Sequence, residues 1–93
     1  MYEDIAKLTL YPEKGIMLTV TTSMKEIKKV CMNGKHAQVI INTRLIMPSD
    51  IVVDKPANRI YWIDEGLGKV ESATLDGQDR YTVIEEKDIY HFH

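Results

Sequence analysis

Two strong turn signals stand 43 positions apart in this chain. Asn33-Gly34 and Asp76-Gly77 are the dipeptides that best suit a type I′ hairpin turn, whose central residues both need positive φ. Pro12 and Pro56 recur with a spacing of 44, and each precedes an apolar run by a few residues. The recurrence predicts two copies of one structural unit, with a one-residue slip in the loop between the second and third strands.

Each unit is predicted to contain four short strands. A period of about 43 residues with four strands per unit is typical of a β-propeller blade or a related array. No stretch shows a convincing helical period, so the predicted fold class is all-β, with two four-stranded antiparallel blades. The predicted strands cover residues 6–10, 16–21, 26–32, 37–41, 49–54, 59–64, 69–75 and 80–84.

The apolar run Ile60-Tyr61-Trp62-Ile63 does not alternate with polar residues, as a strand with one exposed face would. Such a run needs cover on both faces, which a sheet between two other sheets has. We expect Ile60 and Trp62 to face one neighbouring blade and Tyr61 and Ile63 the other, with polar partners for the aromatic rings at these interfaces. Asp64 ends the run, and its carboxylate is expected to accept backbone N–H bonds from the following loop.

Composition narrows the class of protein. The 93 residues fit one domain or part of one, with 44% hydrophobic and 28% charged residues and a net charge of −2. Nothing there favours nucleic acid, no segment approaches the roughly 18–20 apolar residues that span a bilayer, and no signal peptide is evident. The single cysteine, Cys31, has no internal partner and is interpreted as a small buried residue.

The second unit carries a longer motif. It runs Val-Asp at 53–54, Asn-Arg-Ile-Tyr-Trp-Ile-Asp at 58–64, Val-Glu-Ser-Ala-Thr-Leu-Asp-Gly at 70–77 and Thr-Val-Ile at 82–84, preceded by Met-Pro-Ser-Asp-Ile-Val at 47–52. This order resembles an LDL-receptor class B repeat, also called the YWTD repeat, with Ile63 in place of threonine. The structural motif residues are Asp54, Tyr61, Trp62, Ile63, Asp64, Asp76 and Gly77.

The rest of the chain resembles the family less closely. Residues 5–46 read as a divergent repeat in which Met17-Leu18-Thr19-Val20 stands where YWTD should be, and residues 88–93 are similar to a segment that leads into a later blade. The resemblance therefore divides the chain into a divergent blade at 1–47, a well-formed blade at 48–87 and the start of another at 88–93. Since the family needs roughly six units to close its ring, two units imply a fragment of a longer receptor.

The resemblance also implies a function. Proteins of this family act as endocytic or signalling receptors for lipoproteins, yolk proteins or growth-factor-like ligands, outside the cell and beside EGF-like modules. The resemblance implies protein or lipoprotein partners. It implies no cofactor, no metal, no catalytic residue and no direct membrane insertion by this segment. His36, His91 and His93 could titrate near endosomal pH, but we interpret them as ordinary surface or terminal histidines. The sequence does not identify the ligand-binding residues.

Two alternatives remain open. A metal-dependent lactonase-like propeller enzyme would need Glu, Asn and Asp ligands from several blades, for which only Asp50, Asp54 and Asp64 are available. No nucleophile–base pair or glycine-rich phosphate loop is present. An interaction module that closes its ring by oligomerising is the second alternative.

Overall fold

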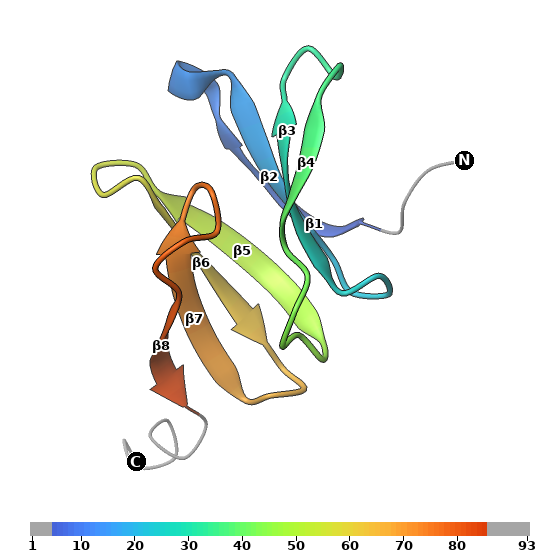
Figure 1. Ribbon diagram of the computed structural model, residues 1–93, viewed down its shortest axis with the longest axis vertical. Helices are drawn as coiled ribbons and strands as arrows, with labels where there is room; N and C mark the ends of the chain where they lie inside the picture. The colour runs from blue at the N-terminus through green and yellow to red at the C-terminus, as the bar shows by residue number, and fades with distance from the viewer. Residues whose placement is uncertain (1–4, 86–93) are drawn as a thin grey trace.

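The computed structural model describes residues 5–85, which form two four-stranded antiparallel sheets (Figure 1). Each sheet is a simple meander, so neighbours in sequence are neighbours in space. The first sheet consists of β1 (Ile5–Tyr11), β2 (Ile16–Thr21), β3 (Glu26–Cys31) and β4 (Ala37–Ile41), with the short 3-10 helix η1 (Pro12–Lys14) between β1 and β2. The second sheet consists of β5 (Pro48–Asp54), β6 (Arg59–Asp64), β7 (Lys69–Thr74) and β8 (Tyr81–Glu85).

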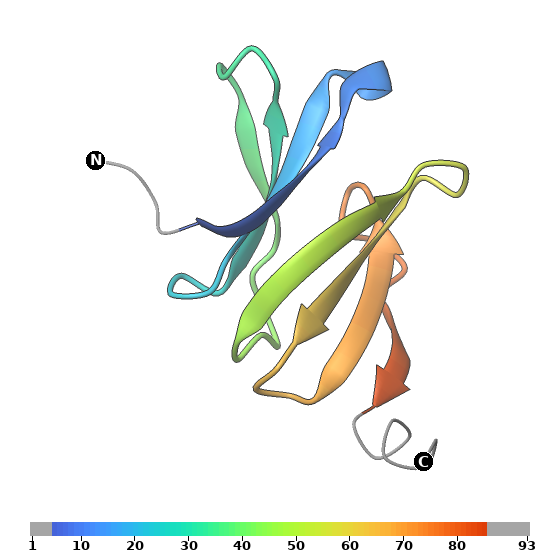
Figure 2. The ribbon, with the colours of Figure 1, turned by 180° about the vertical axis from the view of Figure 1, so that it is seen from behind.

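The fold class predicted from sequence is confirmed. Every observed strand end lies within one residue of the predicted end. The two sheets meet along their first strands, with β1 beside β5, as the view from behind shows (Figure 2). The predicted start of another blade at 88–93, including His91 and His93, lies outside the described residues.

The period of the structure is 43 residues throughout. In the first sheet Ile5 pairs with Thr21 and Tyr11 with Ile16, and the equivalent pairs in the second sheet lie 43 positions later. The predicted one-residue slip is therefore wrong. It arose because Pro12 and Pro56 were matched, whereas Pro12 is the first residue of its four-residue turn and Pro56 the second.

This register moves the divergent motif by one residue. Thr21 pairs with Ile5 as Asp64 pairs with Pro48, so Thr21 is the structural equivalent of Asp64. The segment 18–21, Leu-Thr-Val-Thr, thus occupies the YWTD position, rather than 17–20 as the sequence comparison predicted. Thr19 replaces the tryptophan.

The two turns that set the period are not type I′ turns. Gly34 and Gly77 have φ values of 77° and 82°, but neither Asn33 nor Asp76 is in the positive-φ region. Instead the N–H of Gly34 donates to the carbonyl of Cys31, and that of Gly77 to the carbonyl of Thr74. Each glycine therefore ends a tight turn that lies inside a longer connection between two strands. The connection is not the two-residue hairpin loop that the dipeptides predicted.

The core lies between the sheets. We call the face of each sheet that points to the other its near face, and the opposite face its far face. In the second sheet, the row Ile51, Trp62, Glu71 and Thr82 crosses the near face through direct cross-strand pairs. Ile60 and Trp62 are almost fully buried there, in one cluster with Leu18, Val20, Ile27, Ile41, Leu45, Ile51 and Ala73. The expected burial of Ile60 and Trp62 against a neighbouring blade is confirmed.

The far faces expose apolar side chains. On the second sheet, Tyr61 and Ile63 point away from the first sheet, and Ile63 is 41% exposed beside the exposed Val52. On the first sheet, Leu8 and Val39 are exposed. These two residues belong to the cross-strand row Leu8, Thr19, Lys28 and Val39. Each member of this row stands 43 positions before a member of the near-face row of the second sheet. Equivalent faces of the two sheets therefore point the same way, as in a stack of propeller blades.

Candidate functional site

Asp64 connects both loops at one end of the second sheet. Its Oδ2 accepts the N–H of Ile46 at 2.8 Å, and its Oδ1 accepts those of Met47 at 2.9 Å and Leu67 at 3.0 Å. The side chain is fully buried. The predicted bond to the following loop is present, and the two bonds to residues before β5 add a role that the sequence did not indicate. One carboxylate thus fixes the connection that enters this blade and the turn between β6 and β7.

The surroundings of Asp64 change its acidity. Burial by itself would raise the pKa of this carboxyl, because burial disfavours the charged form. The backbone N–H groups of Met47, Ile46, Leu67 and Gly66 oppose that effect and together hold the pKa below its ordinary value. Asp64 is therefore a permanently charged acceptor at neutral pH, which suits a structural anchor and not a proton-transfer group.

Trp62 does not have the expected polar partner. Within residues 5–85, its Nε1 is buried and makes no hydrogen bond. The ring lies in the apolar near face, and the guanidinium of Arg80 lies 5.2 Å from its centre. Arginine carries only donors and cannot accept the indole proton. The prediction of a polar partner for this ring is therefore wrong, and the ring is held by apolar packing and by a cation–π contact.

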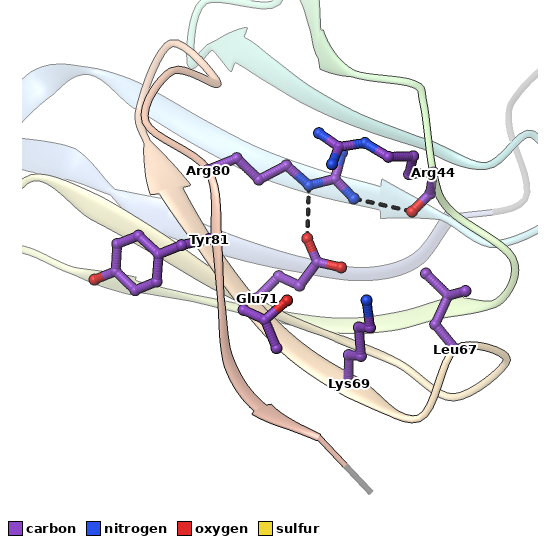
Figure 3. A pocket seen from close by; sticks show the side chains of 7 residues that line it. Arg44, Leu67, Lys69, Glu71, Arg80 and Tyr81 are labelled. Atoms are coloured by element: carbon purple, nitrogen blue, oxygen red, sulfur yellow. Dashed lines mark hydrogen bonds and ion pairs between the residues drawn. The ribbon is translucent and has the colours of Figure 1, made fainter.

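Arg80 and Glu71 form a buried ion pair that the sequence analysis missed (Figure 3). Arg80 Nε donates to Glu71 Oε1 at 2.6 Å, and the side chains are only 8% and 6% exposed. The two terminal nitrogens of Arg80 donate to the carbonyls of Thr43 at 2.8 Å and Arg44 at 2.9 Å. Arg80 thereby ties β7 to the connection between the two sheets. A glutamate inside a strand, followed nine residues later by an arginine, was the available signal.

Other polar contacts join the sheets directly. The hydroxyl of Tyr11 lies 3.1 Å from the carbonyl of Lys55 and 3.0 Å from Asn58 Oδ1, so one proton serves both acceptors. Thr22 Oγ1 donates to the carbonyl of Pro48 at 2.6 Å. Contacts of this kind hold the turns of one sheet against the strands of the other.

The motif residues Asp76 and Gly77 lie at this junction as well. The carboxylate of Asp76 pairs with the ammonium of Lys29 on β3. Gly77 lies against the backbone of Ile40 on β4. Both residues of the second turn therefore contact the first sheet.

The carboxylates considered as metal ligands do not converge. Asp50 accepts the N–H of Ile51 at 2.8 Å, Asp54 lies at the far end of the same strand, and Asp64 is occupied by backbone donors. Within residues 5–85, no group of three His, Cys, Asp or Glu side chains is placed to hold a metal ion. Cys31 is a free thiol that is only half-buried, where the sequence predicted a small buried residue, and His36 is exposed.

An open hollow of about 390 Å³ adjoins the Arg80–Glu71 pair. It lies at the outer end of the near face of the second sheet. Its lining residues are Arg44, Leu67, Lys69, Glu71, Arg80, Tyr81 and Thr82. Figure 3 shows the ammonium of Lys69 on the same side as the Glu71 carboxylate, while the Tyr81 ring points away. Cationic side chains thus predominate around this hollow.

Known proteins share this sequence and fold. Residues 58–91 match the low-density lipoprotein receptor repeat class B. The protein cueball of Drosophila grimshawi is 36% identical over 87 residues, which cover 90% of this chain and 14% of that protein. The vitellogenin receptor Yl of Drosophila melanogaster is 33% identical over 79 residues, covering 84% of this chain and 4% of the receptor. The chain thus spans a small part of these relatives.

A solved structure agrees with the sequence comparisons. A chain from the crystal structure of a nidogen/laminin complex superposes with a TM-score of 0.83 and 25% identity, over 87% of this chain and 31% of that one. The two sheets are accordingly two blades of a YWTD β-propeller. In residues 5–85, no helix has the length and apolar character needed to cross a membrane. Residues 58–91 are a low-density lipoprotein receptor class B repeat, and the chain belongs to the family of proteins that carry this repeat.

Proposed function

We propose that this chain is part of the ligand-binding and ligand-release propeller of an LDL-receptor-like cell-surface receptor that takes up a lipoprotein or a yolk protein. The observation that carries the proposal is the class B repeat, together with the 33% identity to a vitellogenin receptor. The fold match to a chain from a nidogen/laminin complex supports a protein partner in general terms. On this proposal the segment works outside the cell.

The exposed far faces support a place inside a larger ring. Val52 and Ile63 on one side, and Leu8 and Val39 on the other, are apolar and exposed. Further blades would cover them as the two present blades cover each other. In this proposal, 1–47 and 48–87 are successive blades of six, 88–93 begins the next, and EGF-like modules flank the ring.

Uptake by cells tests the proposal. The full-length protein is expressed in cells that lack related receptors, and internalisation of fluorescent lipoprotein and of fluorescent vitellogenin is measured. We expect uptake of one of the two, with release when the medium is brought to about pH 5.5, the range in which histidines titrate. Cells that express the protein without residues 48–87 serve as the control. Surface expression without binding of either ligand would contradict the proposal.

Signalling by a growth-factor-like ligand is a second form of the same class of function. Binding of a secreted protein ligand at the cell surface without internalisation would favour it. Nothing in the described residues favours the lactonase-like alternative, because the three aspartates it would use lie apart and one is occupied by backbone donors.

A further inference from the structure

We propose that the hollow beside Arg80 binds a carboxylate from an acidic segment of a protein partner. This inference deepens the proposed receptor function and rests on it, since it names the chemistry of a partner. It is carried by the charge around the hollow, by the fixed position of Arg44 and by the shape of the site.

The hollow carries an excess of positive charge. Arg80 and Glu71 neutralise each other at 2.6 Å. The remaining charged lining residues are Arg44 and Lys69, and within residues 5–85 neither side chain has an ion-pair partner. Two unmatched cations thus lie at one hollow in a chain whose net charge is −2. An anion in the hollow would be attracted by both cations.

Arg44 is held at the hollow by the buried ion pair. Its φ is 53°, a left-handed conformation that is uncommon for a non-glycine residue. The carbonyls of Arg44 and its neighbour Thr43 accept the two terminal nitrogens of Arg80, which fix this backbone. A strained residue that buried donors hold in place is a frequent feature of binding sites. The backbone that carries the exposed Arg44 side chain is therefore set before a ligand arrives.

Lys69 is fixed from the other side. It is the first residue of β7 and pairs with Asp64 on β6 and Glu85 on β8, so the sheet sets where its side chain leaves the backbone. Asp64 in turn anchors Leu67, which lines the same hollow. A carboxylate would meet a cation from each wall, with the apolar side chain of Leu67 and the hydroxyl of Thr82 beside it.

These features favour a peptide carboxylate over a polyanion. Nucleic acids and long sulfated chains need a row of cations along a surface. This hollow has two unpaired cations, with an apolar neighbour in Leu67. One or two acidic side chains next to an apolar one match that arrangement.

Peptide binding to the full-length protein tests the inference. The probe is a fluorescent synthetic peptide of alternating glutamate and leucine, and a glutamine–leucine peptide is its uncharged counterpart. Affinity is measured by fluorescence anisotropy at low and at physiological ionic strength. We expect Arg44→Gln and Lys69→Gln each to weaken binding of the acidic peptide about three- to fivefold, the range of an exposed ion pair. Lys35→Gln, an exposed lysine in the β3–β4 turn, is the control and should leave binding unchanged.

The outcomes separate the inference from the proposed function. Equal binding of both peptides, no binding of either, or an equal effect of all three substitutions would overturn the inference. A sulfated oligosaccharide that binds more tightly and depends on the same two residues would also overturn it. None of these results affects the uptake measurement, which by itself decides the receptor function. Unchanged thermal unfolding of the variants ensures that a loss of binding reports on the site.

Discussion

Gly77 in the second blade lies directly against the backbone of Ile40 in the first. A Cβ atom placed on Gly77 would lie 3.1 Å from the carbonyl carbon of Ile40 and closer still to its oxygen. Gly34, the equivalent residue 43 positions earlier, has a similar φ but open space around it. Both glycines therefore supply the positive φ that the turn needs. Gly77 in addition allows the turn to lie close against the first blade.

Alanine at these two glycines should separate backbone conformation from close packing. Gly34→Ala is expected to lower the free energy of unfolding by about 1 kcal/mol, because alanine is unfavourable at positive φ. Gly77→Ala should cost a further 2 kcal/mol or so, since the methyl group collides with a backbone that cannot easily move. Urea denaturation of both variants measures the difference. Equal losses would show that the two blades do not touch at this turn.

Asp64→Asn should strongly destabilise the second blade. The amide group cannot accept from all three N–H donors, and its own N–H₂ would face at least one of them. With a charged acceptor lost and a donor left unpaired, the free energy of unfolding should fall by about 3 kcal/mol. Asp76→Asn is the matched control, because the Asp76 carboxylate is largely exposed and, among residues 5–85, pairs with Lys29 alone. Its expected cost is below about 1 kcal/mol.

The lowered pKa of Asp64 predicts a loss of stability in acid. A carboxyl whose pKa is lower in the folded state stabilises the fold above the unfolded pKa of about 3.9, and this stabilisation is lost as the pH falls through the folded value. Stability should therefore be steady near neutral pH and should decline below about pH 4. In Asp64→Asn the decline should be shallower. Urea midpoints at a series of pH values measure both slopes.

Glu13 provides a comparison for this pH dependence. Its pKa is also lowered, chiefly by a hydrogen bond from its own backbone N–H, with a smaller contribution from Lys55. Because Glu13 is exposed, solvent screens these effects. Glu13→Gln should accordingly keep almost all of the acid decline. If Glu13→Gln flattened the decline of stability in acid as much as Asp64→Asn does, Asp64 would not be the carboxyl responsible for that decline.

The sequence predicted the strands and the anchor role of Asp64 because both depend on local pattern. The apolar run at 60–63 and the acid that ends it need no knowledge of a distant partner. The register of the divergent blade was missed because matching Pro12 with Pro56 ignored where each stands in its turn. Cross-strand pairing, which decides register, involves residues such as Ile5 and Thr21 that a linear comparison does not bring together.

The candidate site was mostly beyond the reach of the sequence. Arg80 contacts Thr43 and Arg44, which are 37 and 36 positions away, through their backbone carbonyls. A carbonyl acceptor leaves no signature in residue type. The first blade gave no hint either, because Lys28 and Ala37 stand at the positions equivalent to Glu71 and Arg80. An ion pair that occurs in one repeat alone is invisible to an argument from repetition.

The Arg80–Glu71 pair should behave as a single unit under mutation. Glu71→Leu leaves a buried guanidinium without its counterion and is expected to cost about 3 kcal/mol or more, and Arg80→Met likewise leaves a buried carboxylate. The double variant Glu71→Leu, Arg80→Met removes both charges and should cost clearly less than the two single changes together. A double-mutant cycle by urea denaturation gives the coupling energy between the two side chains.

Asp79→Asn, in the exposed pair with Arg59, is the control and should change stability by less than about 1 kcal/mol. Additive effects at positions 71 and 80 would mean that Arg80 acts through the Thr43 and Arg44 carbonyls and that its contact with Glu71 contributes little.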